Sequence, residues 1–70
     1  MGLLLKQRKQ EVLDAVQRVD EKARAMKEAL EVRPPTKESD KAAVDAIEEW
    51  KEAQNALVTA VNTLNSMVHA

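Results

Sequence analysis

Apolar residues recur along this chain at alternating steps of four and three residues, which is the spacing of a coiled-coil seam. The pattern occurs twice and predicts two helices, over about residues 3–32 and 40–68. Lys9 and Gln54 are its polar interruptions. The two seams comprise Leu5, Lys9, Val12, Val16, Val19, Ala23, Met26 and Leu30, and then Ala43, Ile47, Trp50, Gln54, Leu57, Val61, Leu64 and Val68.

A proline pair, Pro34 and Pro35, separates the two seams. Proline lacks an amide donor and disfavours helical geometry in the residue before it, so the first helix should end just before the pair. Thr36, Ser39 and Asp40 follow, and each offers a side-chain oxygen for the N-cap of the second helix. We therefore expect a turn over about residues 33–39 within a single helical-hairpin domain, residues 1–70.

Folding the chain at this turn aligns the seams in one antiparallel register, in which the numbers of facing residues add up to 73. The register sets Trp50 over Ala23 and Leu30 over Ala43, so that large side chains face small ones. The sequence predicts an all-α, coiled-coil-like antiparallel hairpin, and a single long helix opened at the prolines is the main alternative. The predicted hairpin core comprises Leu5, Val12, Val16, Val19, Ala23, Met26, Leu30, Ile47, Trp50, Leu57, Val61 and Leu64.

One seam offers little core for a chain of 70 residues, because small domains bury a low fraction of their surface. Small residues also recur every seven positions beside the second seam, at Ala46, Ala53 and Ala60, and would let another helix approach closely. We expect another chain to complete the hairpin to a four-helix bundle or a larger assembly, with a homo-oligomer as one form.

The last eighteen residues, 53–70, carry no charge, although charged residues make up 33% of the chain. Depletion of charge is typical of the centres of protein interfaces, where uncharged polar groups still form hydrogen bonds. The alternative is a helix end that frays in water. We predict protein docking at the open end of the hairpin and along the second helix, through Leu3, Leu4, Leu13, Ala53, Val58, Ala60, Asn62 and Met67.

Residues for catalysis or metal binding are scarce. The chain has no cysteine and one histidine, His69, with no serine or cysteine nucleophile adjacent to it. Asp45, Glu48, Glu49 and Glu52 line one helical face, which we interpret as a solvated stripe. We expect no catalytic residues, metal, cofactor or small-molecule substrate, and a protein that is not an enzyme.

Charge is unevenly distributed. Residues 1–35 carry eight basic and six acidic side chains (+2), and residues 36–70 carry three and six (−3). An RNA-binding hairpin dimer, using Arg18, Lys22 and Arg24, is one alternative function, but acids interleave with these bases and the pI is 5.8.

A peripheral membrane protein anchored by Leu3–Leu5 is the other alternative, although a long basic amphipathic face is missing. We expect no signal peptide or transmembrane segment and a cytoplasmic location. The favoured function is a small interaction or assembly subunit of scaffolding or chaperone-like type.

Overall fold

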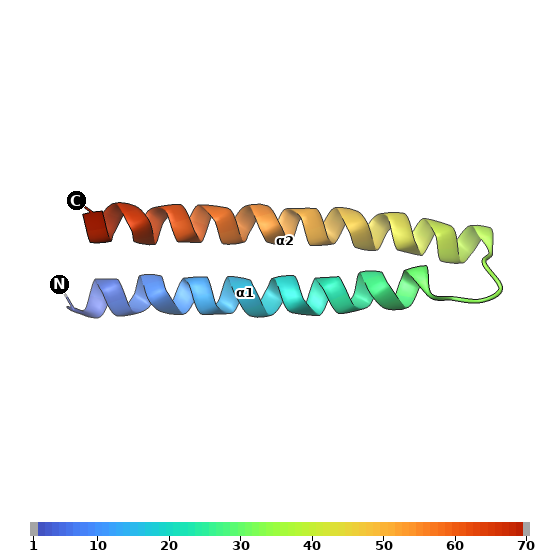
Figure 1. Ribbon diagram of the computed structural model, residues 1–70, viewed down its shortest axis with the longest axis horizontal. Helices are drawn as coiled ribbons and strands as arrows, with labels where there is room; N and C mark the ends of the chain where they lie inside the picture. The colour runs from blue at the N-terminus through green and yellow to red at the C-terminus, as the bar shows by residue number, and fades with distance from the viewer. Residues whose placement is uncertain (1, 70) are drawn as a thin grey trace.

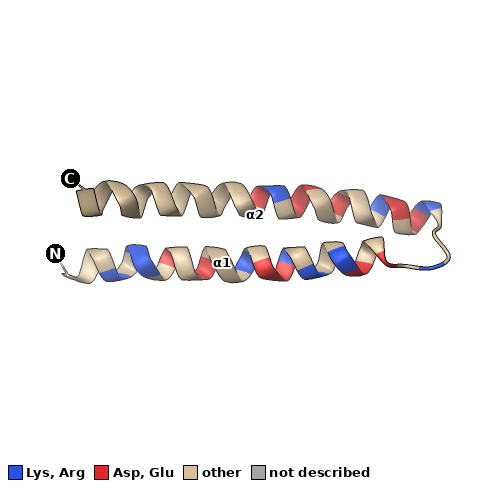
Figure 2. Cartoon of the chain, in the orientation of Figure 1, with Lys and Arg blue, Asp and Glu red and all other residues tan. Residues whose placement is uncertain are grey.

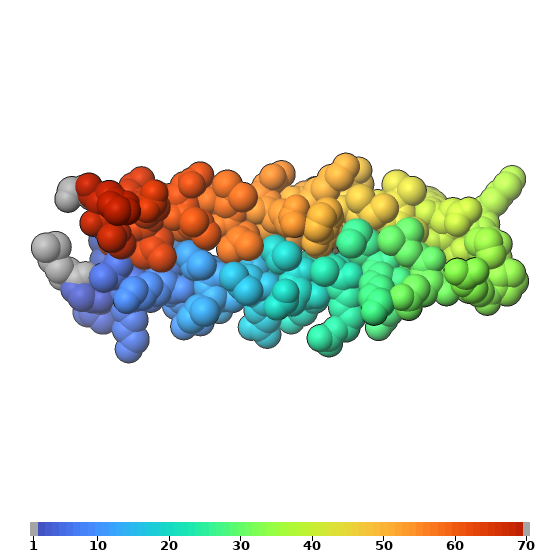
Figure 3. Space-filling view, in the orientation of Figure 1, coloured from blue at the N-terminus to red at the C-terminus, as the bar shows by residue number. Residues whose placement is uncertain are grey.

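Two long antiparallel α-helices make up the computed structural model, which describes residues 2–69 (Figure 1). Helix α1 spans Gly2–Leu30 and helix α2 spans Lys37–His69, and they pack against each other from the turn to the open end (Figures 1 and 3). No strand occurs within residues 2–69. The predicted all-α hairpin is confirmed, and the alternative of a single long helix opened at the prolines is not what forms.

The turn is shorter than predicted at its C-terminal side. Helix α1 ends at Leu30, and the amide of Glu31 still donates to the carbonyl of Lys27 at 3.0 Å. Helix α2 begins at Lys37 rather than near residue 40, directly after the prolines and Thr36. Of the three candidate caps, the structure uses the earliest, so the helix gains almost a full turn.

Thr36 and Ser39 form a reciprocal capping arrangement at the start of α2. The Thr36 hydroxyl accepts a hydrogen bond from the Ser39 amide at 3.0 Å, and the Ser39 hydroxyl accepts one from the Thr36 amide at 2.8 Å. The first amides of a helix have no partner within the helix, and these two hydroxyls supply partners at this end.

Thr36→Ala is expected to lower the free energy of unfolding by about 1 kcal/mol, the usual cost of losing an N-cap oxygen. The matched control is Thr59→Ala, in the interior of α2, where the hydroxyl only donates to the carbonyl of Asn55. This control should change stability by less than about 0.5 kcal/mol. Urea unfolding followed by circular dichroism at 222 nm measures both, and equal midpoints would contradict the capping role.

The seam between the helices consists of residues that lose the most solvent exposure, again at steps of three and four. In α2 three of them are fully buried, Ala43 at 6%, Ala46 at 8% and Ala53 at 5% exposure, and the others in both helices are half-buried. The observed seam comprises Leu5, Arg8, Val12, Ala15, Val19, Lys22, Met26 and Ala29 on α1, and Ala43, Ala46, Trp50, Ala53, Leu57, Ala60, Leu64 and Met67 on α2.

These two stripes pair antiparallel when the numbers of facing residues add up to 72, one less than predicted. The pairing sets Val19 opposite Ala53 and Met26 opposite Ala46. The ion pair between Lys22 Nζ and Glu49 Oε1, 3.6 Å apart, fits this register. Alanine at every seventh position lets the backbones approach closely, so larger side chains of the other helix fit between them.

The shift of register corrects part of the predicted core. Val16, Leu30 and Val61 are 40%, 59% and 44% exposed and lie outside the seam. They sit one residue beyond Ala15, Ala29 and Ala60, the small residues that take the seam positions instead. The other predicted core residues are half-buried, namely Leu5, Val12, Val19, Ala23, Met26, Ile47, Trp50, Leu57 and Leu64.

The basic residue in the seam is Arg8, and Lys9 is exposed. Arg8 bonds its own helix, because Nη1 donates to both carboxylate oxygens of Glu11 at 3.0 and 3.1 Å. Its Nε is buried without a hydrogen-bond partner. Gln54, the other polar interruption of the predicted seam, is also exposed.

Candidate interaction face

One side of the hairpin is a charged groove. It forms two adjoining hollows of about 280 and 260 Å³, which share Arg18 and Ala56. Alanines form its floor because they leave space above them, and charged side chains form its walls. The lining residues are Glu11, Asp14, Ala15, Arg18, Lys22, Glu49, Glu52, Ala53, Ala56 and Ala60, and residues of both helices therefore share this side.

The opposite side of the seam is an apolar face. Groove residues such as Arg18 and Glu49 stand one position before a seam residue in the sequence. Val16 and Val61 stand one position after a seam residue. Successive helical residues point about 100° apart, so the two sets lie on opposite sides of the seam. We define the apolar face as Leu13, Val16, Leu30, Val44, Ile47, Val58, Val61 and Val68. Lys9 and Gln54 also follow seam residues and interrupt this face.

Most of this face remains in contact with solvent after the helices have packed. Leu13, Leu30, Val44, Val58 and Val68 are 56–61% exposed, and Ile47 is half-buried. Scattered exposed apolar residues are ordinary, but an apolar stripe along one side of a small protein marks a binding surface.

The open end adds further apolar surface. Leu3 is 78% and Leu4 48% exposed beside the last turn of α2. Figure 2 shows that the half of α2 nearest this end carries no charged side chain, whereas α1 is charged along most of its length. The neutral end of the hairpin thus adjoins the apolar face at Val68.

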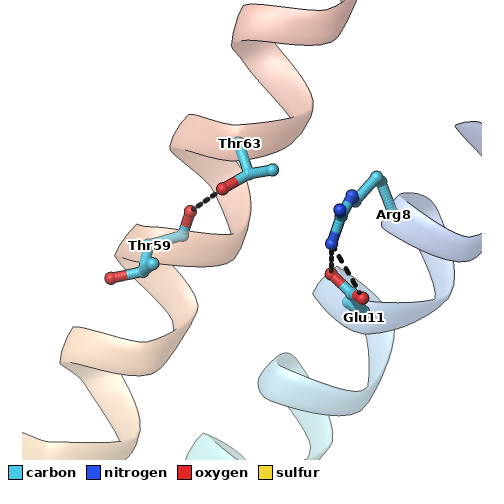
Figure 4. A network of polar contacts seen from close by, with 4 residues as sticks. All are labelled: Arg8, Glu11, Thr59 and Thr63. Carbon is cyan, nitrogen blue, oxygen red and sulfur yellow. Dashed lines mark hydrogen bonds and ion pairs between the residues drawn. The ribbon is translucent and has the colours of Figure 1, made fainter.

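Thr59 and Thr63 reduce the polarity of the neutral half of α2. Each hydroxyl donates to the backbone carbonyl four residues earlier at 3.0 Å, Thr59 to Asn55 and Thr63 to Thr59, and Figure 4 shows the second of these bonds. Thr59 and Thr63 precede the seam residues Ala60 and Leu64, so they lie on the groove side of α2 and outside the apolar face. On α1, the side chains of Arg8 and Glu11 form an ion pair within one helix (Figure 4).

The predicted partner-binding residues divide into two groups. Leu3, Leu4, Leu13, Val58 and Asn62 are exposed. A second group lies in the seam: Ala53 is buried, and Ala60 and Met67 are half-buried between the helices. These three residues recur every seven positions and pack between α1 and α2, so the chain's own helices already cover them.

The sequence prediction also missed part of the face. The sequence pattern does not predict a binding role for Val44, and it predicts Val16, Leu30 and Val61 in the core. The available signal was the alanine repeat at residues 46, 53 and 60, which runs parallel to the valine and leucine repeat and competes with it for the seam.

No three histidine, cysteine or acidic side chains among residues 2–69 lie close enough to hold a metal ion. Neither helix, within those bounds, has the length and apolar character needed to cross a membrane. On the groove side, Arg18 and Lys22 stand among Glu49 and Glu52, which offsets the positive charge proposed for RNA binding.

Comparison of the chain with protein families, with characterised proteins and with solved structures found no match.

Proposed function

We propose that this chain is a non-enzymatic protein-interaction or assembly subunit, a hairpin whose apolar face and open end are covered by protein. The observation that carries the proposal is the exposure of Leu13, Val58, Val61 and their neighbours in a closed hairpin. Their side chains are available without unfolding. The helix pair supplies the rigid scaffold that holds them in one row.

The free energy gained when a partner covers these side chains supports the proposed function. Covering the exposed half of a valine or leucine contributes about 1 kcal/mol. Eight such residues amount to roughly 8 kcal/mol before the costs of association, comparable with the whole stability of a small domain. A scaffolding or chaperone-like role follows from the same surface, because both need an apolar face presented by a stable frame.

A protein is a better occupant of this face than a nucleic acid. RNA binding requires a dense row of cationic groups, and the apolar residues interrupt any such row here. The basic side chains of α1 are also partly engaged, Arg8 with Glu11, Lys22 with Glu49 and Lys27 with Glu31.

Photo-crosslinking in the cells that make the chain tests the proposal. A photoreactive phenylalanine analogue replaces Val61, on the apolar face, or Glu52, in the charged groove. Illumination is expected to join the Val61 variant to protein and to leave the Glu52 variant free. Absence of any adduct at Val61, or adducts with lipid or RNA alone, would refute the proposed function.

A further inference from the structure

We propose that the occupant of the apolar face is a second copy of this chain, laid face to face with the first and with both turns at the same end. Each α1 then lies over α2 of the other copy, and the four helices form a bundle. This inference rests on the proposed function and names its partner.

The exposed area of the hairpin is large enough for such a dimer. The chain exposes 5728 Å², whereas a compact monomer of its mass exposes about 4,400 Å². The radius of gyration is 16.0 Å, against about 11 Å for a compact chain of this length. The excess of about 1,300 Å² exceeds the roughly 800 Å² that each partner contributes to a standard interface.

Charge selects this arrangement from the two possible twofold dimers. A twofold axis parallel to the helices sets α1 of one copy over α2 of the other. A twofold axis perpendicular to the helices, in the plane between the copies, sets α1 over α1. Among the residues that follow a seam residue, and so lie on the apolar side, α1 carries Lys6, Lys9, Asp20 and Lys27 and α2 carries Lys51. The first dimer brings Asp20 of each copy to Lys51 of the other, whereas the second sets the mainly basic edge of α1 against itself.

The helix directions are favourable in the proposed dimer, although the alternative twofold dimer also has antiparallel neighbours, so charge and not direction selects between them. In the proposed dimer every pair of neighbouring helices, within a copy and between copies, is antiparallel. Antiparallel neighbours align their macrodipoles favourably, and this is the usual arrangement in four-helix bundles.

The outer edges of the apolar face match at two successive positions. On α1 this edge carries Leu13, Asp20 and Lys27, and on α2 it carries Val58, Lys51 and Val44, all at seven-residue spacing. In the observed register Leu13 is within one residue of the level of Val58, and Asp20 of the level of Lys51, whereas Lys27 falls beside Val44. Within one hairpin these edges are on different helices and on opposite margins of the face. Between two copies they meet, apolar residue to apolar residue and acid to base.

Sedimentation equilibrium over a hundredfold range of concentration measures the association. The wild-type chain is expected to reach twice its 7.8 kDa. Val61→Glu is expected to weaken the dimer about a hundredfold or more, because it puts an unpaired charge into the apolar face. Thr59→Glu is the matched control: it adds the same charge two residues away, on the groove side, and should leave the dimer intact.

A wild-type chain that is a folded monomer at every concentration would overturn the proposal, whether or not Val61→Glu folds. If Val61 in such a chain still crosslinks to another protein, the proposed function stands without the second copy. A monomer that floats with anionic phospholipid vesicles would assign the face to a membrane instead, and would overturn both.

Disulfide trapping tests the arrangement, and the natural chain has no cysteine to interfere. Leu13→Cys and Val58→Cys chains are mixed and oxidised, and a covalent dimer containing one of each is expected. Leu13→Cys mixed with Thr59→Cys should give none. Efficient linking of Leu13→Cys to itself would show α1 over α1 and overturn the proposed arrangement.

Discussion

Ala53→Leu is expected to lower the free energy of unfolding by about 2 kcal/mol, whereas Ala56→Leu, on the same helix, leaves it nearly unchanged. Alanine and leucine have similar helix propensities, so the difference reports packing alone. Ala53 is 5% exposed and lies opposite Val19, in a seam that is close because of its alanines. Leucine there must push the helices apart or adopt a strained rotamer. Ala56 is exposed and has room for the larger side chain.

Chemical unfolding followed by circular dichroism measures both variants, at one protein concentration because association also stabilises the folded state. This pair of variants distinguishes the two registers. In the register predicted from the sequence, Ala53 lies beside the seam and Gln54 within it. Equal stability of the two leucine variants would therefore contradict the observed seam.

Trp50→Ala is expected to destabilise the hairpin by about 3 kcal/mol, the lower end of the range for tryptophan in a core, because Trp50 is only half-buried. It is the one aromatic residue of the chain and the largest side chain of the seam. Its loss leaves a gap that the neighbouring alanines are too small to fill.

The same unfolding measurement tests this variant, with Lys41→Ala as the control, because Lys41 is an exposed residue of α2. That control should remain within about 0.5 kcal/mol of wild type. A loss below about 1 kcal/mol for Trp50→Ala would mean that the tryptophan contributes little packing, and would contradict its place in the seam. Tryptophan fluorescence of the wild type gives an independent probe of the same transition.

The distribution of residue sizes connects the fold with the proposed function. The chain places alanines between its own helices and keeps Val16, Leu30 and Val61 outside. A close alanine seam gives extensive contact from small side chains. The larger branched residues are then free to pack against another molecule. A hairpin built on the valine and leucine repeat would bury these residues and present alanines instead.

Several features followed from the sequence by itself. The repeat of three and four residues determined two helices, the proline pair located the turn, and the position of the turn made the helices antiparallel neighbours. These features depend on local backbone chemistry and on hydrophobic period, which a sequence displays directly. The half of the seam that contains Val12, Val19, Trp50 and Leu57 was predicted for the same reason.

The tertiary structure decided which of two parallel repeats completes the seam. Ala15 and Val16, or Ala60 and Val61, occupy adjacent positions with the same period, and each choice gives a continuous apolar seam. Hydrophobicity favours valine and close approach favours alanine. The outcome depends on the distance between the two helices, which no single position in the sequence specifies. Because the alanines occupy the seam, the neighbouring valines remain exposed and available to a partner.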